Sequence, residues 1–344
     1  MKIGVFKSFD GVHEKVVAAC KDLGVEFEVV DILSANWMEN VKKSNADGFF
    51  CPSNCTSQEK KSILDERYYF VSQLMNRPIY PDYLGGFIHE SKRNMAAWLE
   101  LYGYPHAKTR VFTDKHEALD YADHCRYPFV TKANLGSGSS KVIIIKSKRQ
   151  ARKMIKKCFT WFDTPKWALL NIPFHAFYYK VKFKGITFCD RRNPQKDYFI
   201  AQDYFENVKC EWRILKIGDS YFGHQKLLKG EFASGSGLVG WVAPPKELLL
   251  MVKDLCEKGG FPCMDVDIFE NNKGEYCINE LQSFFGSYLD YQMKIDDVPG
   301  RYVYKNGDFC FEEGEFNTFG SNRLKIENFC NLLKDSASVN SLSL

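Results

Sequence analysis

Apolar, strand-like runs alternate with amphipathic, helix-like runs over residues 1–85, and this alternation constrains the fold more than any other feature. The strand-like runs are KIGVF (2–6), VEFEVVDIL (25–33), DGFFCPS (47–53) and RPIYPD (77–82). Helical periodicity fills the intervals between them. This order favours an open, mainly parallel sheet covered by helices. No G-x-G-x-x-G follows the first run, so a dinucleotide site is not indicated.

The chain is long enough for two or three domains, with 344 residues of which 45% are hydrophobic. We expect an N-terminal α/β domain over 1–88, a second block over 89–201 and a third over 202–330. Residues 331–344 are expected to form a polar tail, since they are rich in serine and asparagine.

Features of the whole sequence point to a cytoplasmic protein. MKIGVFKSF is too short and too polar for the apolar part of a signal peptide, and no run of eighteen apolar residues exists. Twelve cysteines are scattered along the chain, as in proteins of a reducing compartment. CPSNC (51–55) lacks a second Cys or His pair at zinc spacing, which favours structural thiols.

The segment VTKANLGSGSSKVIII (130–145) is a strand, a glycine-rich turn and a second strand. It is not a Walker A loop, because Lys132 precedes the glycines and no helix follows them. Lys132 ends an apolar strand and therefore needs an anionic partner or a route to solvent. The turn offers backbone amides and hydroxyls that suit phosphate oxygens, although many such hairpins bind no ligand.

Two later segments place acidic and basic residues side by side. In EWRI, Glu211 and Arg213 share a strand face, a pattern that a surface ion pair also explains. CMDVDIFENNKGEYCINELQ (263–282) predicts a hairpin with Asp265 and Asp267 on one face, and Glu280 and Gln282 on one face of the returning strand. Oxygen ligands on facing strands are typical of a Mg²⁺ site, whereas a hairpin with a polar solvent face needs no metal.

Together, these segments resemble the ATP-grasp superfamily, and most closely its carboxylate–amine ligases, such as ribosomal-protein glutamate ligases and D-alanine–D-alanine ligases. The resemblance covers most of residues 1–290 and implies two α+β subdomains that clamp ATP after the N-terminal domain. It rests on Lys92, YPFVTKANLGSGS, IAQDYF, EWRI and the 263–282 hairpin, in this order.

The resemblance implies roles for individual residues. Those implied for ATP binding are Lys92, Lys132, the loop Gly136, Ser137, Gly138, Ser139 and Ser140, the connector Gln202, Asp203, Tyr204 and Phe205, and Glu211 at the ribose. Arg213 and Lys226 are implied to act on the transferring phosphoryl group. Asp267, Glu280 and Gln282 are implied to hold Mg²⁺, two ions in relatives.

The sequence departs from the family pattern on the substrate side. Gln282 stands where the family usually has asparagine, and Ala233, Ser234 and Gly235 replace an arginine and asparagine that are frequent in relatives. The nucleotide half of the pattern is complete. We therefore expect metal binding with altered geometry and a different acceptor site.

Basic residues are concentrated in residues 141–200, which contain fifteen Lys or Arg and three acidic residues, a balance of +12. The stretch 158–192 is basic and aromatic. One interpretation is a strand pair whose basic face is solvated and covers the lid subdomain. The other is a contact surface for an acidic or lipid-linked substrate, or for an anionic membrane surface. A nucleic acid partner is not indicated, because no RRM, KH or OB signature accompanies the charge.

We expect an ATP- and Mg²⁺-dependent ligase that activates a carboxylate as an acyl phosphate for attack by an amine. A kinase acting on a small-molecule acceptor and a non-catalytic nucleotide-binding protein are the alternatives. The carboxylate and amine belong to small molecules or polymer precursors. The resemblance also implies a homo-oligomer.

Overall fold

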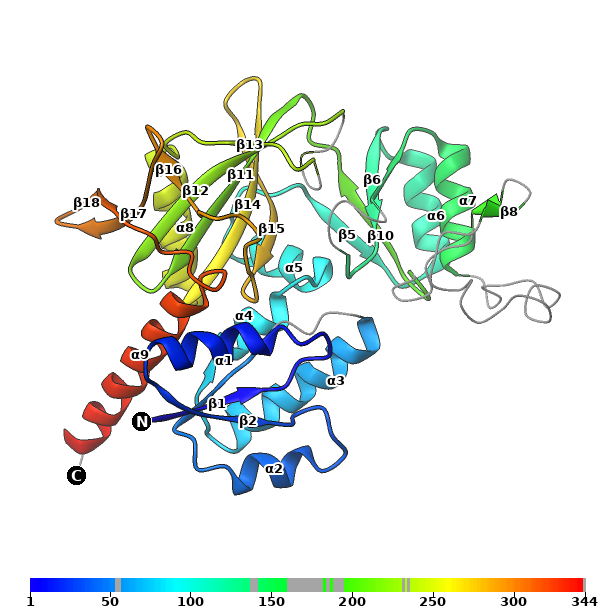
Figure 1. The fold of residues 1–344 in the computed structure, drawn as a ribbon. Helices are drawn as coiled ribbons and strands as arrows, with labels where there is room; N and C mark the ends of the chain where they lie inside the picture. Colours follow the sequence, from blue (N-terminus) through cyan, green and yellow to red (C-terminus); the bar gives the residue numbers. More distant parts are fainter. Residues whose placement is uncertain are drawn as a thin grey trace. The chain divides into compact units, whose positions relative to one another are not determined.

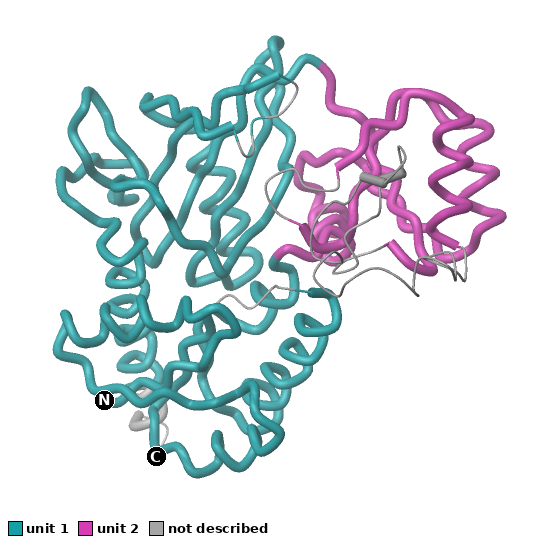
Figure 2. Tube along the Cα trace, turned by 45° about the vertical axis from the view of Figure 1, so that its right-hand side comes forward, with its two compact units in different colours: residues 1–89, 207–344 teal, residues 90–206 magenta. Residues whose placement is uncertain are grey.

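The chain divides into two compact units in the computed structural model, and Figure 2 colours them separately. Residues 1–89 and 207–344 form unit 1, and residues 90–206 form unit 2. The structure describes residues 1–52, 57–136, 142–159, 182–183, 186–187, 195–230, 233 and 236–342.

Unit 1 begins with a four-stranded parallel sheet in the order β2-β1-β3-β4 (Figure 1). Its strands are β1 (Lys2–Phe6), β2 (Glu26–Val30), β3 (Gly48–Phe50) and β4 (Ile79–Tyr80). Its helices are α1 (His13–Asp22), α2 (Trp37–Lys43), α3 (Gln58–Tyr69), the π-helical turn η1 (Phe70–Leu74) and α4 (Tyr83–Ile88). The predicted strand–helix alternation is confirmed here, since a helical crossover between neighbouring strands lets them run parallel.

The second sheet of unit 1 is larger, and its strands follow the order β15-β14-β11-β12-β17-β16. The strands are β11 (Val208–Ile217), β12 (Ser220–Leu227), β14 (Cys263–Asn271), β15 (Tyr276–Gln282), β16 (Lys294–Ile295) and β17 (Val298–Lys305). The short strand β13 (Val239–Gly240) pairs with β12, and β18 (Asp308–Glu313) pairs with β17. Helix α8 (Lys246–Gly259) packs on β11 and β14.

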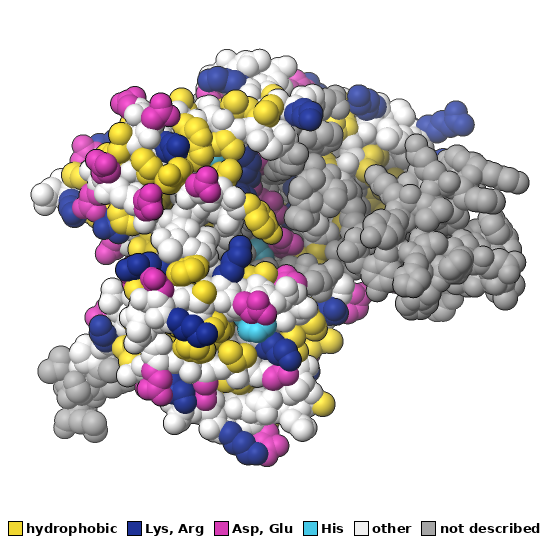
Figure 3. All heavy atoms as spheres, viewed as in Figure 1, with side chains coloured by type: hydrophobic (Ala, Val, Ile, Leu, Met, Phe, Trp, Pro, Cys, Tyr) yellow, Lys and Arg dark blue, Asp and Glu magenta, His cyan; other side chains and the backbone are white. Residues whose placement is uncertain are grey.

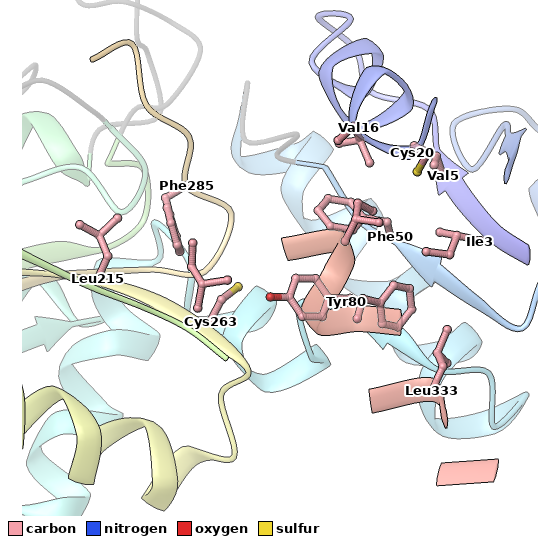
Figure 4. Close-up of a cluster of buried hydrophobic side chains, with 14 of the residues drawn as sticks. Ile3, Val5, Val16, Cys20, Phe50, Tyr80, Leu215, Cys263, Phe285 and Leu333 are labelled. Atoms are coloured by element: carbon pink, nitrogen blue, oxygen red, sulfur yellow. The ribbon is translucent and has the colours of Figure 1, made fainter. Parts of the chain in front are cut away.

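One apolar core joins the two sheets of unit 1. Ile3 and Val5 of the small sheet, Leu215 and Cys263 of the large sheet, and Tyr80 belong to a single buried cluster. Figure 4 shows side chains from both sheets on either side of the Tyr80 ring. The large sheet is therefore held in place by the N-terminal domain through apolar burial.

The C-terminal helix corrects one prediction. The polar tail predicted over 331–344 is wrong as far as Leu342, because helix α9 spans Asn322–Leu342. Ile326, Phe329 and Leu333 are buried in the same cluster as Ile3. Burial of these apolar side chains stabilises the first half of α9. Once that half has formed, the more polar residues that follow can extend the helix, because adding a residue to an existing helix costs less than starting one.

Unit 2 contains an antiparallel sheet in the order β5-β10-β6-β7. Its strands are β5 (Thr109–Phe112), β6 (Phe129–Lys132), β7 (Val142–Ile145) and β10 (Phe199–Asp203). The helices are α5 (Lys92–Tyr102), α6 (Lys115–His124) and α7 (Lys148–Cys158), and β8 (Lys182–Phe183) pairs with β9 (Ile186–Thr187). Residues of α6 and α7 form one apolar core with the sheet. Pairing of β6 with β7 confirms the two strands predicted within 130–145, and residues 137–141 between them lie outside the described residues.

The surface of unit 1 mixes both signs of charge. Cationic and anionic side chains are interspersed over the face of unit 1 seen in Figure 3. Within the described residues, no helix combines the length and the apolar character that crossing a membrane requires.

Candidate functional site

Charged side chains from three adjacent strands gather on one face of the large sheet of unit 1. Glu211 of β11 lies opposite Lys226 of β12, and Arg213 of β11 lies opposite Asp267 of β14. Because alternate residues of a strand share a face, Glu211 and Arg213 point to the same side, and Asp265 joins Asp267. We call these five residues the charge cluster.

Asp267 is the centre of the charge cluster. Its Oδ1 accepts a hydrogen bond from Arg213 Nε at 3.1 Å, and its Oδ2 accepts from Arg213 Nη2 at 3.2 Å and from Lys226 Nζ at 2.5 Å. Lys226 Nζ also lies 3.5 Å from Glu211 Oε2. Glu211 is fully buried, and Asp267 is 1% exposed. The bidentate geometry fixes the Arg213 guanidinium in one plane.

The cluster shifts the pKa values of its members in opposite directions. Burial opposes ionisation of Asp267, but Arg213 and Lys226 outweigh it and hold the pKa of Asp267 well below its usual range. Burial and the adjacent Asp267 raise the pKa of Asp265 to about 7, although Arg213 Nη2 lies 3.0 Å from its Oδ2. Burial alone would lower the pKa of Lys226, yet Asp267 and Glu211 raise it. Both cations therefore stay charged at neutral pH.

His224 of β12 is 3% exposed and pairs in register with Arg213. Its Nδ1 lies 2.9 Å from the backbone oxygen of Gln292, so Nδ1 must carry the proton. Burial lowers the pKa of His224 to about 4. It is therefore a neutral neighbour of the charge cluster.

A β-bulge adds a residue that the sequence did not single out. Asp267 pairs with Glu280 and the next residue, Ile268, pairs with Ile278, so Asn279 is the extra residue of β15. The Asn279 side-chain amide donates to Glu211 Oε1 at 2.7 Å. A bulge leaves no signal in the period-two pattern, which explains why Asn279 was missed.

The residues predicted to bind Mg²⁺ are neighbours on β14 and β15. Asp267 pairs with Glu280, and Asp265 pairs with Gln282, which confirms that each pair of ligand positions shares a face. Carboxylate and amide oxygens suit a hard cation. Asp265 Oδ2 forms an ion pair with Arg213 Nη2 at 3.0 Å, but no described residue donates a hydrogen bond of good geometry to either Asp265 oxygen. The described residues contain no group of three or more His, Cys, Asp or Glu arranged as metal ligands. These oxygens fit Mg²⁺ only if other donors complete its shell.

In unit 2, the two lysines predicted to bind phosphates are both buried, each 6% exposed. Lys92 is the first residue of α5, and its Nζ donates to the backbone oxygen of Gly136 at 3.3 Å. Lys132 is the last residue of β6. Ser137, Gly138, Ser139 and Ser140 lie outside the described residues.

Asn134 ties the loop after β6 to the start of α5, and sequence reasoning missed it. Its Oδ1 accepts from the backbone N–H of Arg93 at 3.0 Å and from Ser91 Oγ at 3.3 Å. Its backbone oxygen accepts from the N–H of Lys92 at 3.1 Å. Asn134 is 1% exposed, so it fixes Lys92 relative to the strand that carries Lys132.

The predicted adenine connector begins in β10 of unit 2. Gln202 is buried and donates through Nε2 to Thr109 Oγ1 at 2.8 Å. Asp203 is exposed and pairs with Arg110 Nη1 at 2.6 Å. Tyr204 and Phe205 follow β10 and are half-buried.

The structure therefore brings the predicted residues together within each unit. Unit 1 assembles Glu211, Arg213, Lys226 and Asp267, with Glu280 beside Asp267. Three residues depart from the family pattern in the region expected to bind the substrate. Ala233 is buried in unit 1, whereas Ser234 and Gly235 lie outside the described residues.

No family model and no curated protein matches this chain. Solved structures do match, at low sequence identity. The chain is similar to D-cycloserine synthetase, with 14% identity and a TM-score of 0.57 over 97% of this chain and 100% of that one. D-alanine–D-alanine ligase from Bacillus anthracis shares 13% identity, with a TM-score of 0.54 over 98% and 99% of the two chains.

Two further structures extend this likeness. A RimK domain ATP-grasp protein from Sphaerobacter thermophilus shares 11% identity, with a TM-score of 0.52 over 83% of this chain and 92% of that one. The Bacillus anthracis ligase complexed with ATP matches with a TM-score of 0.53 and 13% identity, over 83% and 86% of the two chains. The predicted fold class is confirmed: this chain has the ATP-grasp fold.

Proposed function

We propose that this protein is an ATP- and Mg²⁺-dependent ligase, which joins a carboxylate to an amine through an acyl phosphate. The observation that carries the proposal is the charge cluster. Two partly buried cations, Arg213 and Lys226, are held in fixed positions by the buried Asp267 on one face of the large sheet. Phosphoryl transfer needs fixed positive charge at the transferring group more than it needs a protein nucleophile.

Each group of residues has a role in this proposal. Lys92 and Lys132 hold the phosphates of ATP, and Gln202 to Phe205 receive adenine, with Glu211 at the ribose. Asp267, Glu280 and Gln282 hold Mg²⁺, which supplies charge neutralisation to the phosphates. Arg213 and Lys226 stabilise the negative charge that develops on the transferring phosphoryl group.

The reaction needs no covalent bond to the protein. A substrate carboxylate oxygen attacks the γ-phosphorus of ATP and displaces ADP, which gives an acyl phosphate. The amine nitrogen then attacks the acyl carbon, phosphate leaves, and the amine loses a proton. What the protein supplies is orientation of the reactants and neutralisation of their charge.

The proposed substrates are small molecules or polymer precursors that carry a carboxylate and an amine. The predicted anionic or lipid-linked contact at 158–192 falls largely outside the described residues and stays a prediction. The predicted homo-oligomer, cytoplasmic location and peripheral membrane association also stay predictions.

The test is release of ADP and phosphate from Mg²⁺-ATP across a matrix of carboxylates and amines. Lys132→Ala and Glu280→Ala are the site variants, and Lys146→Ala and Glu313→Ala, which alter exposed side chains, are the matched controls. We expect release only with one carboxylate plus one amine, abolished in both site variants and retained in both controls.

Two results would contradict the proposal. Formation of ADP with a single acceptor, without free phosphate, would make the protein a kinase. ATP binding without turnover across the matrix would favour a non-catalytic nucleotide-binding protein, in line with the departures at Gln282 and Ala233.

A further inference from the structure

Helix α7 of unit 2 presents a basic groove that the proposed ligase site does not use. Ala151, Ile155 and Cys158 are buried in the unit 2 core. Another side of the same helix borders a shallow, open surface groove of about 680 Å³. The residues that line it are Lys148, Arg149, Arg152, Lys153 and Lys156.

The groove already holds one carboxylate of its own chain. Asp123 of α6 accepts hydrogen bonds from Arg152 Nη1 through both oxygens, each at 2.7 Å, and its Oδ1 lies 3.2 Å from Lys148 Nζ. Lys148 and Arg152 are four residues apart and therefore neighbours on the helix surface. Their spacing is thus suited to holding one carboxylate between two cations.

The same spacing recurs one residue further along, in Arg149 and Lys153. Both side chains are exposed, and no described carboxylate lies within ion-pair distance of either. Arg149 and Lys153 therefore add two positive charges that no described carboxylate offsets. A carboxylate supplied by another molecule would meet Arg149 and Lys153 as Asp123 meets Arg152 and Lys148.

The lining favours an acidic peptide over other anionic partners. Among the described residues, the lining has no aromatic side chain on which a nucleic acid base would stack, and no apolar side chain that would enter a bilayer. Phosphates are often bound by arginine through two parallel hydrogen bonds. Arg152 already pairs with Asp123, so among the described lining residues Arg149 is the one guanidinium that could bind a phosphate in this way. Lysines, which are single flexible charges, suit carboxylates spaced along a flexible chain.

We propose that the α7 groove binds an acidic peptide segment of a partner protein, with its carboxylates at Arg149 and Lys153. The groove runs for about 12 Å from Lys148 to Lys156, at about 1.5 Å of rise per helical residue. A few consecutive acidic side chains are therefore enough to occupy it.

The experiment measures fluorescence anisotropy of a labelled sixteen-residue polyglutamate peptide titrated with the full chain. A polyglutamine peptide of equal length is the uncharged control. The groove variant is Arg149→Ala/Lys153→Ala, and Lys21→Ala/Lys42→Ala removes the same charge from exposed helix positions of unit 1. We expect Kd for polyglutamate to rise at least tenfold in the groove variant alone, and binding to weaken as salt is raised.

Oligothymidylate of sixteen nucleotides and vesicles of phosphatidylserine and phosphatidylcholine are the comparison ligands. Equal loss of polyglutamate binding in the two double variants would overturn the proposal, because net charge alone would then explain it. Tighter binding of the oligonucleotide or the vesicles, lost in the groove variant, would assign the groove to that partner instead. Matching circular dichroism spectra of the two variants would show that both are folded.

Discussion

Replacement of Asp267 by asparagine tests whether the charge cluster is an electrostatic unit. The change keeps the shape of the side chain but removes the buried anion that the partly buried Arg213 and Lys226 share. Loss of one partner from a buried ion pair destabilises a protein by about 3–5 kcal/mol. We expect a loss of this size, since Asp267 is 1% exposed and receives three hydrogen bonds.

The assay is urea unfolding at pH 7, followed by circular dichroism. Asp308→Asn is the matched control, because Asp308 pairs with Lys246 at 2.8 Å on the surface, where both side chains are more than half exposed. Exposed pairs contribute little to stability, since solvent screens them. Equal unfolding midpoints for the two variants would refute the reasoning.

The pH dependence gives a second check on Asp267. Its pKa is lower in the folded protein than in the unfolded chain, where it is about 3.9. A lowered carboxylate pKa stabilises the fold above the unfolded value, and this stabilisation is lost as pH falls through the folded value. Below about pH 4, the difference between wild type and Asp267→Asn therefore shrinks. Between about pH 4 and 7 the difference also contains the titration of Asp265, whose pKa of about 7 depends in part on Asp267. A difference that grew as pH fell below about 4 would contradict the assigned direction.

Two further substitutions and one titration probe single residues. Asn279→Ala leaves buried Glu211 without its amide donor, so the free energy of unfolding falls by about 1–3 kcal/mol, whereas Asn272→Ala in the exposed turn has little effect. Asn134→Ala removes the acceptor of the Arg93 amide, so hydrogen exchange of that amide accelerates, and unchanged protection would contradict the role of Asn134. His224, whose pKa is lowered to about 4, gives no NMR titration between pH 5 and 8.

The sequence predicted those parts of the site that follow from regular spacing. Alternation along a strand places Asp265 with Asp267, and the hairpin turn brings Glu280 and Gln282 beside them. The fold class followed from the order of the motifs, since each motif by itself is only moderately specific. What was predicted correctly is periodic or local in the chain.

The contacts that were missed have other origins. The bulge at Asn279 breaks the period of two, so the pattern of β15 does not indicate that this side chain reaches Glu211. Asn134 bonds to residues more than forty positions away, and no local preference encodes such a contact. Residues 331–342 are polar enough to suggest a coil, yet the buried Ile326 and Phe329 upstream stabilise the helix that they extend.

The shared core of unit 1 has a consequence for the order of events during synthesis. Ile3 and Leu333 belong to one buried cluster, although the chain forms all of unit 2 between the two halves of unit 1. As the ribosome releases the chain, the small sheet emerges first, and part of its apolar surface stays exposed until α9 appears, because Ile326, Phe329 and Leu333 of α9 belong to the same core. Unit 2 lacks this dependence, because its core is drawn from residues 112–201 alone. Translation stalled shortly before residue 322 would therefore leave a nascent chain with a finished unit 2 and an open apolar face, which is a substrate for chaperones.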